Sequence, residues 1–257
     1  MAKRLFCADY QQLTCCVGSH VQKRKTYADT VAALPLSLPA QIFTGSPRSM
    51  RRATIDEQDC LRAAELCRQR DIPLFIHACY IVNLSADDAG PAVEYLQHEL
   101  RLGAKLGARG VVVHVGKSLK DTPPAAEARM LAAIREALTE ATSCPLLLET
   151  PAGQGTELLT SLESFGGFAA QIDDPMFGLC VDTCHVFSTG CDPHFYLGVL
   201  HARFGRRVAL VHFNDSKCPL DSRKDRHEIP GQGYIGADAL GQVMQFCRQK
   251  GIPMVQE

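Results

Sequence analysis

The sequence predicts an α/β fold in which eight parallel strands alternate with helices and close into a barrel. Three observations support this prediction. Short apolar runs recur along the whole chain of 257 residues, amphipathic segments separate most of them, and no linker or change of composition divides the chain. Right-handed crossovers between successive parallel strands close such a repeat into a TIM (β/α)8 barrel. An open doubly wound sheet is the alternative architecture.

Eight segments have the character of buried parallel strands. Each is short, rich in Val, Ile, Leu or Phe, and nearly continuous in its apolar character, which is typical of strands covered on both faces. The predicted strands are residues 15–21, 39–44, 73–78, 110–115, 144–150, 178–183, 207–215 and 252–257.

Six segments between the strands have the pattern of amphipathic helices. One face of residues 56–70 carries four small or apolar residues at helical spacing: Cys60, Leu61, Ala64 and Cys67. The predicted helices cover residues 56–70, 91–107, 123–142, 157–172, 192–205 and 237–250. The connection at residues 22–38 has no clear pattern. We expect one barrel domain over residues 16–257, preceded by an N-terminal extension of residues 1–15.

The composition is that of an ordinary globular protein, with 46% hydrophobic and 21% charged residues. A formal net charge of −1 gives no overall basic field for a polyanion. No apolar run approaches the roughly 18 residues of a membrane span, so no membrane partner is expected. The first residues lack the apolar segment of a signal peptide, and most of the twelve cysteines sit among apolar neighbours. We therefore expect a reduced, intracellular protein, in the cytoplasm or the nucleus.

One glycine-rich segment imitates a dinucleotide-binding fingerprint. Residues 231–236, GQGYIG, match G-x-G-x-x-G letter for letter. The fingerprint requires a strand immediately before it, whereas the preceding residues here are RHEIP. The segment is therefore interpreted as a loop before a helix.

Polar residues follow the predicted strands at the end where barrel enzymes carry their chemistry. The candidates are His77, His114, Glu149, Asp182, His185, His212, Asp225, His227 and Glu257. Taken singly, each could be a hydrogen-bonded or solvated residue without a function. Together they place five histidines and four carboxylates on one face of the barrel. Four adjacent carboxylates would repel one another unless cations lie among them.

The mixture of imidazole nitrogen and carboxylate oxygen suits zinc, manganese or iron. Nine ligands are too many for one tetrahedral ion, so they indicate two or three ions with a bridging carboxylate. The remaining histidines are interpreted differently: His98, His194 and His201 lie in predicted helices and are expected to be structural, whereas His20 ends the first strand and borders the site as a ligand or a supporting group. Cys180 and Cys184 are expected to pack rather than to bind metal.

Three long segments resemble those of the endonuclease IV family of abasic-site DNA repair enzymes: LLLETPAGQGTEL (146–158), GLCVDTCHVFSTG (178–190) and HFNDSKCPLDSRKDRHEIPGQGYIG (212–236). The resemblance runs from about Val17 to the last residue. It implies a TIM barrel with three Zn²⁺ ions, cleavage of the phosphodiester bond 5′ to an abasic site in duplex DNA, and trimming of blocked 3′ ends. It also implies a monomer.

Carried over by position, the resemblance implies three ligand sets. His77, His114 and Glu149 would hold one zinc; Glu149 would bridge to a second zinc, held also by Asp182, His212 and Glu257; His185, Asp225 and His227 would hold the third. Glu149 is the implied catalytic residue, because it would position the attacking water between two ions. Arg48 and Tyr80 occupy the positions of residues that contact the DNA, and Arg51 and Arg52 add to a basic rim.

The chain departs from the family in two places. Residues 1–15 precede the usual start, and the chain ends at Glu257, where the family continues into a final outer helix. From this we expect an exposed flank on the last strand, a mobile Glu257, and lower stability and activity than in a chain extended by a further helix. Two other functions stay open: a metal-dependent sugar isomerase or epimerase with fewer metals, and a DNA-binding protein without activity.

Overall fold

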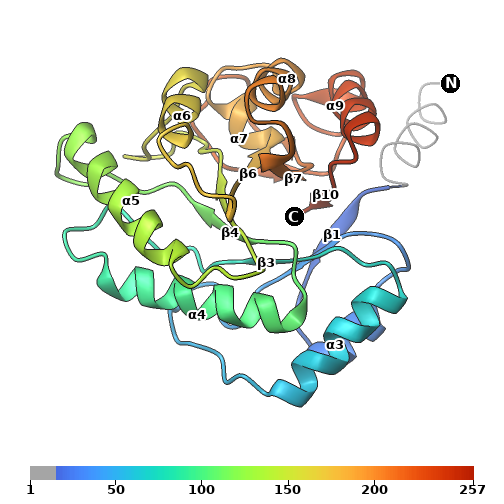
Figure 1. Ribbon diagram of the computed structural model, residues 1–257. Helices are drawn as coiled ribbons and strands as arrows, with labels where there is room; N and C mark the ends of the chain where they lie inside the picture. Colours follow the sequence, from blue (N-terminus) through green and yellow to red (C-terminus); the bar gives the residue numbers. More distant parts are fainter. Residues whose placement is uncertain (1–15) are drawn as a thin grey trace, which may run out of the picture.

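The computed structural model describes residues 16–257 and contains a closed barrel of parallel strands (Figure 1). The barrel strands are β1 (Gly18–Val21), β2 (Ala40–Ile42), β3 (Leu74–His77), β4 (Val111–His114), β5 (Leu146–Glu149), β6 (Phe177–Asp182), β7 (Val208–His212) and β10 (Met254–Gln256). Each pairs with its neighbours in chain order, and the first pairs with the last, Gly18 opposite Val255. The prediction of a TIM barrel is confirmed, and the open sheet is excluded. The predicted extension, residues 1–15, lies outside the described residues.

Helices cover the outside of the barrel. They are α2 (Tyr27–Ala32), α3 (Glu57–Gln69), α4 (Gly90–Leu106), α5 (Pro123–Leu138), α6 (Leu162–Ala169), α7 (Thr183–Ser188), α8 (Pro193–Phe204) and α9 (Gly236–Lys250), with a 3-10 turn η1 (Gly205–Arg207) after α8. In Figure 1, α3 to α5 lie along one side of the barrel and α6, α8 and α9 along the other. No described helix is long and apolar enough to cross a membrane.

The helix boundaries follow from local sequence. The carboxylate of Asp56 accepts a hydrogen bond from the Asp59 backbone at the start of α3, and Asp192 caps α8 in the same way. At the other end of α4, Gly107 adopts φ 65°, a left-handed conformation in which glycine is favoured. These residues fix where α3 and α8 begin and where α4 ends.

The structure adds to or corrects three sequence expectations. The connection at 22–38 contains α2, and the short helix α7 was not predicted. Leu61 does not lie on the inner face of α3: it is 67% exposed, whereas Cys60, Ala63 and Cys67 are buried. The inner face follows positions 60, 63 and 67, and Leu61 is rotated away from that line by about 100°.

The interior of the barrel is a small apolar cluster beneath the strand ends. It consists of Phe75, Val112, Leu147, Cys180, Leu210 and Val255, one residue from each of six strands. Cys180 therefore packs as expected. The larger core fills the layer between strands and helices. Together these two cores support the polar residues at the carboxyl ends of the strands.

The glycine-rich segment after β7 closes around a buried carboxylate of the protein itself. Asp215, at the start of the two-residue strand β8 (Asp215–Ser216), accepts hydrogen bonds from the backbone N–H groups of Gly231 (2.9 Å), Gly233 (3.0 Å) and Ile235 (2.9 Å). A Cβ atom at Gly233 would lie 2.3 Å from the Ser216 carbonyl oxygen. Gly233 thus allows this segment to pack closely against Asp215 and Ser216. This agrees with the interpretation of the segment as a loop before a helix.

Candidate metal centre

The register of the parallel strands brings the predicted ligands to one end of the barrel. His77, His114, Glu149, Asp182 and His212 are the last residues of β3, β4, β5, β6 and β7, and Glu257 follows β10 directly. Strands β4 and β5 end at the same level, since His114 pairs with Glu149, and so do β6 and β7, since Asp182 pairs with His212. The ends of β3 and β4, and those of β5 and β6, are offset by two residues, since His77 pairs with Val112 and Glu149 with Cys180. The close approach of these side chains is therefore a consequence of the strand register.

His77, His114 and Glu149 form the first set. The Nε2 atoms of His77 and His114 lie 3.3 and 3.1 Å from Glu149 Oε2. His77 Nδ1 donates a hydrogen bond to the Ala78 carbonyl oxygen (2.7 Å), which turns Nε2 toward the carboxylate. Within the described chain, His77 Nε2 and Glu149 Oε2 are buried and have no hydrogen-bond partner.

Glu149 also belongs to the second set, with Asp182, His212 and Glu257. Its other oxygen, Oε1, lies 2.9 Å from His212 Nδ1, and Glu257 Oε2 lies 3.1 Å from the same nitrogen. Glu149 thus presents one oxygen to each set. Glu257, which we expected to be mobile, is bonded through its backbone N–H to Asn214 Oδ1 (3.0 Å) and lies with its side chain among His20, Gln41 and His212.

His185, Asp225 and His227 form the third set, which lies partly on the loop after β7. The Nε2 atoms of His185 and His227 are 3.4 and 3.1 Å from Asp225 Oδ1. His185 is on α7, where its backbone N–H donates to the capping carboxylate of Asp182 and its Nδ1 donates to the Thr150 carbonyl oxygen. His227 Nε2 is also 3.6 Å from Asp182 Oδ2, so Asp182 lies between the second and third sets.

Cys184 is buried close to the third set. Its sulfur lies within 4.8 Å of a carboxylate oxygen of Asp182 and a ring nitrogen of His227. Burial, together with the negative charge of Asp182, raises the pKa of the Cys184 thiol to about 11. Cys184 thus lies buried beside the third set, next to Asp182 and His227.

The charges of the three sets depend on one another. Burial opposes ionisation of Glu149, but the attraction of His212 and His114 is stronger and holds its pKa well below the usual value. Burial opposes ionisation of Asp225 too, but the attraction of His185 and His227 outweighs it and lowers the pKa of Asp225. The pKa of His185 is raised well above the usual value because Asp182 and Asp225 outweigh burial in the same way. Glu149 and Asp225 thus lie among histidines that favour their ionised forms.

The donor atoms fit bound metal ions. In each set the ligand atoms lie within 4.8 Å of one another. Within residues 16–257, the Nε2 atoms of His77, His185 and His227 are buried and have no hydrogen-bond partner, although each faces a carboxylate. Nitrogen and oxygen donors in this mixture suit zinc and related transition metals. Carbonyl groups behind His77 and His185 orient the rings, as is usual for histidines that bind metals.

Several residues that sequence reasoning did not single out complete the centre. Asn214 donates to Asp182 Oδ2 (2.7 Å), and Gln41 contacts both His212 and Glu257. His20 belongs to no metal-binding set among the described residues; its Nδ1 is 3.0 Å from Glu257 Oε1, so it is a supporting neighbour. The one available signal for Gln41 was its amide within an otherwise apolar strand.

The mouth of the centre is lined by Tyr80. Its ring lies 5.6 Å from those of His77 and His114 and is half exposed, and burial of the remainder raises the pKa of the phenol to about 12. A cavity of about 500 Å³ extends from Tyr80 across His114, His185 and His227. Arg48 is exposed on the neighbouring loop, which is tied to Tyr80 by a hydrogen bond from the Tyr80 N–H to the Pro47 carbonyl (2.8 Å).

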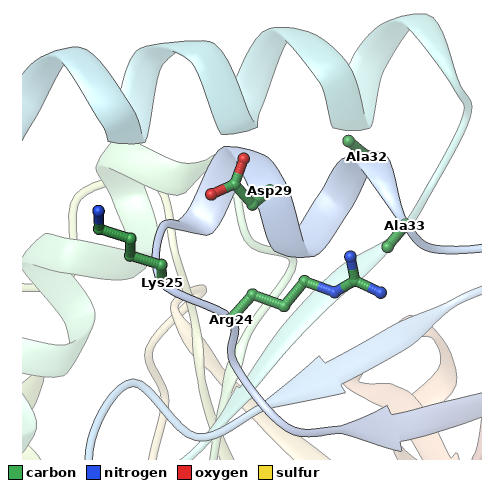
Figure 2. Close-up of a pocket in the computed structure, with 5 residues that line it drawn as sticks. All are labelled: Arg24, Lys25, Asp29, Ala32 and Ala33. Carbon is green, nitrogen blue, oxygen red and sulfur yellow. The ribbon is translucent and has the colours of Figure 1, made fainter.

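Basic side chains lie on the two loops that follow β1 and β2. Lys23, Arg24 and Lys25 follow β1, and Arg48, Arg51 and Arg52 follow β2; the two strands are paired, so the loops are neighbours at the same end as the metal centre. A shallow pocket of about 440 Å³ lies beside α2 (Figure 2). There the Arg24 side chain extends toward Ala33, whereas Lys25 points the other way. Asp29 is the acidic residue of that pocket, which contains none of the predicted metal ligands.

Comparisons with known proteins agree with this geometry. The family model described as a xylose isomerase-like TIM barrel matches residues 40–255. The chain is 34% identical to the probable endonuclease 4 of Streptomyces avermitilis, over 94% of this chain and 84% of that protein. It is 33% identical to the probable endonuclease 4 of Symbiobacterium thermophilum, over 94% and 92%.

Solved structures have the same architecture. Endonuclease IV from Thermus thermophilus superposes with a TM-score of 0.79 at 30% identity, covering 94% of this chain and 91% of that one. A D-tagatose 3-epimerase-like protein superposes with a TM-score of 0.70 at 16% identity, covering 93% and 90%. The second likeness shows the fold alone.

Proposed function

The chain belongs to the endonuclease IV family of xylose isomerase-like TIM barrels, and from this premise we propose that it hydrolyses the phosphodiester bond 5′ to abasic sites in duplex DNA with three zinc ions. It is an endonuclease of DNA repair that acts at apurinic and apyrimidinic sites. We include in the proposal the trimming of blocked 3′ ends, a monomeric state, and a catalytic unit formed by residues 16–257. A DNA substrate also implies an intracellular location.

One observation carries the proposal: Glu149 presents one carboxylate oxygen to each of two donor sets, and a third set adjoins them through Asp182. Three adjacent sets suit a phosphodiester, whose attacking water, non-bridging oxygens and leaving oxygen all need stabilisation. Zinc, when bound, lowers the pKa of water toward about 7 and acts as a Lewis acid on the phosphoryl oxygens.

The proposed ligands are His77, His114 and Glu149 for the first ion, Glu149, Asp182, His212 and Glu257 for the second, and His185, Asp225 and His227 for the third. The chain contributes positions that are fixed before substrate arrives. Glu149 is fully buried and lies between histidines from three strands, so its carboxylate can hold the attacking water in one place. Asp182 is held by Asn214 and by the start of α7, which keeps the second and third sets at a constant separation.

We propose that Arg48 and Tyr80 contact the DNA at the lesion. Tyr80 lies at the mouth of the centre with half of its side chain exposed, and its backbone is tied to the loop that carries Arg48. Insertion of side chains into a duplex costs unstacking energy, and the cost is lowest where a base is already missing. The basic residues on the β1 and β2 loops would contact the phosphate backbone on either side, and their position at the same end as the metal centre supports this.

A sugar isomerase or epimerase is the second candidate, because such enzymes share the fold. It would need fewer ions and no basic rim. Metal content and substrate separate the two functions: about three zinc ions per chain supports the nuclease, and one or two manganese ions would support the isomerase.

The proposal is tested by incubating the zinc-loaded protein with duplex DNA that contains one stable abasic analogue. We expect incision on the 5′ side of the analogue, and loss of incision by about a thousandfold or more in Glu149→Gln, which keeps the shape of the side chain and removes its charge. Glu136→Gln, an exposed position on α5, is the matched control and should cleave normally. An intact, metal-loaded protein that leaves this duplex uncut and converts a ketose to an aldose would contradict the proposal.

A further inference from the structure

Gln41 is a fully buried polar residue whose side chain connects three strand ends of the metal centre. Its Oε1 atom lies 2.9 Å from His212 Nε2, and its Nε2 atom lies 2.8 Å from Glu257 Oε1 and 3.1 Å from His20 Nδ1. His212 is on β7, Glu257 follows β10, and His20 is on β1. Gln41 is on β2, so the first two strands of the chain contribute to the centre even though they carry none of its proposed ligands.

The direction of the Gln41 amide is determined by its neighbours. An amide has one accepting oxygen and one donating nitrogen, and the two ends are not interchangeable here. If the amide were reversed, its oxygen would lie against the carboxylate oxygen of Glu257, and two acceptors would repel each other. Glu257 therefore directs the amide nitrogen toward itself and leaves the oxygen facing His212.

That direction determines which nitrogen of His212 carries a proton. Because Gln41 Oε1 only accepts, the hydrogen bond requires a proton on His212 Nε2. The other nitrogen, Nδ1, is the one that faces the second set: Glu149 Oε1 lies 2.9 Å and Glu257 Oε2 lies 3.1 Å from it. A neutral imidazole can bind a metal only through its unprotonated nitrogen, so this tautomer is the one that a metal at the second set requires.

We infer that Gln41 is a positioning residue: it fixes the tautomer and orientation of His212 and, with its other end, holds Glu257 in place for the second metal. The role in metal binding rests on the proposed function, whereas the effect on His212 does not. His77 and His185 are oriented by backbone carbonyls, which a substitution cannot remove. At His212 the orienting group is the side chain of Gln41, so its role can be tested by mutation.

The test uses two substitutions of Gln41 and one control. Gln41→Leu removes both polar atoms at nearly constant volume. Gln41→Glu keeps an acceptor for His212 but has no donor for Glu257. Thr44→Val is the control: it removes another buried hydrogen bond close to the same strand, from Thr44 Oγ1 to Glu99 Oε2 (2.7 Å), without touching His212.

Two measurements separate positioning from a general loss of structure. The first is the solvent-exchange rate of the His212 Nε2–H proton in protein labelled with ¹⁵N-histidine. We expect slow exchange in the wild type, Gln41→Glu and Thr44→Val, and fast exchange in Gln41→Leu. The second is the zinc dissociation constant from competition with a chelator, which should rise about 10- to 100-fold in Gln41→Leu and stay unchanged in Thr44→Val. Excess zinc should restore incision by Gln41→Leu.

The inference is overturned if Gln41→Leu keeps slow exchange of that proton and the zinc affinity of the wild type. If Gln41→Leu does not fold, fast exchange in Gln41→Glu overturns it instead, because that variant keeps the acceptor. A wild-type protein that leaves abasic DNA uncut but shows the expected exchange pattern would refute the proposed function while leaving the role of Gln41 toward His212 intact.

Discussion

Glu149 and Glu99 are both fully buried glutamates, yet their surroundings act on ionisation in opposite ways. Glu149 is surrounded by histidines, and its pKa lies well below the usual value even though burial opposes this. Glu99, on α4, accepts one hydrogen bond, from Thr44, and burial raises its pKa to about 7. Burial alone therefore does not distinguish these two acids; the histidines around Glu149 do, and positive partners of this kind are typical of functional acids.

A third buried acid, Asp215, is compensated in another way. Its carboxylate receives backbone N–H groups from the segment that leads into α9. It has neither a histidine partner nor a metal-binding set among the described residues. We therefore propose that Glu149 is a metal-binding acid, Glu99 an uncompensated acid and Asp215 a structural acid, and each proposal predicts a different response to perturbation.

The largest effect is expected from removing the metal near Glu149. Zinc that binds the folded chain alone stabilises it by about 4 kcal/mol at a thousand times its dissociation constant. Addition of a chelator should lower the free energy of unfolding by at least that amount, measured by urea denaturation with and without zinc. The same loss should occur in Glu99→Gln, because Glu99 is not a ligand. A chelator with no effect on stability would contradict the interpretation of the Glu149 cluster as a metal centre.

A smaller effect is expected from the pH dependence that Glu99 introduces. Its pKa in the folded chain, about 7, lies above the ordinary value of 4.5, so the folded state holds a proton that the unfolded state releases between these values. Stability from this group is therefore fully present below pH 4.5 and is lost as the pH rises toward 7, by an amount on the order of 3 kcal/mol. Glu99→Gln should remove this loss.

The measurement is the free energy of unfolding of zinc-loaded wild type and Glu99→Gln at pH 5 and pH 8. The difference between the two proteins should shift in favour of the variant at the higher pH. Glu136→Gln is an exposed control and should follow the wild type. Equal pH dependence in wild type and Glu99→Gln would show that Glu99 is compensated by a partner that its contacts do not reveal.

The smallest effect is expected at Asp215. In Asp215→Asn, the amide nitrogen would replace one of two oxygens that both accept backbone N–H groups, so donors would face donors. We expect a loss of about 2 kcal/mol in stability. The zinc content should stay at about three per chain, since no ligand atom is removed. A variant that folds normally but has lost one zinc would show that the structural and metal-binding acids cannot be separated in this way.

The sequence was sufficient to predict the barrel because its strands are continuous apolar runs and six of the eight end in a polar residue. Because His77, His114 and Glu149 end their strands, the sequence also predicted that they lie at one end of the barrel. The structure brings them together there. The helix α7 was missed because it has only six residues and its capping residue, Asp182, also ends a strand.

Other features depend on contacts between distant segments and could not be inferred from local pattern. Gln41 is separated by 171 residues from His212 and by 216 from Glu257. The contacts of Asp215 with the glycine-rich segment likewise need the folded loop. Leu61 was assigned to the wrong face of α3 because it is apolar. The buried face is formed by the smaller residues Cys60, Ala63 and Cys67.

We propose that Glu149 is shared between two of three metal positions, and anomalous diffraction at the zinc absorption edge from crystals of the zinc-loaded protein measures this sharing. We expect three peaks at the carboxyl end of the barrel: two on either side of the Glu149 carboxylate, and a third beside His185, Asp225 and His227. A single peak, or peaks that leave Glu149 without a metal neighbour, would contradict it.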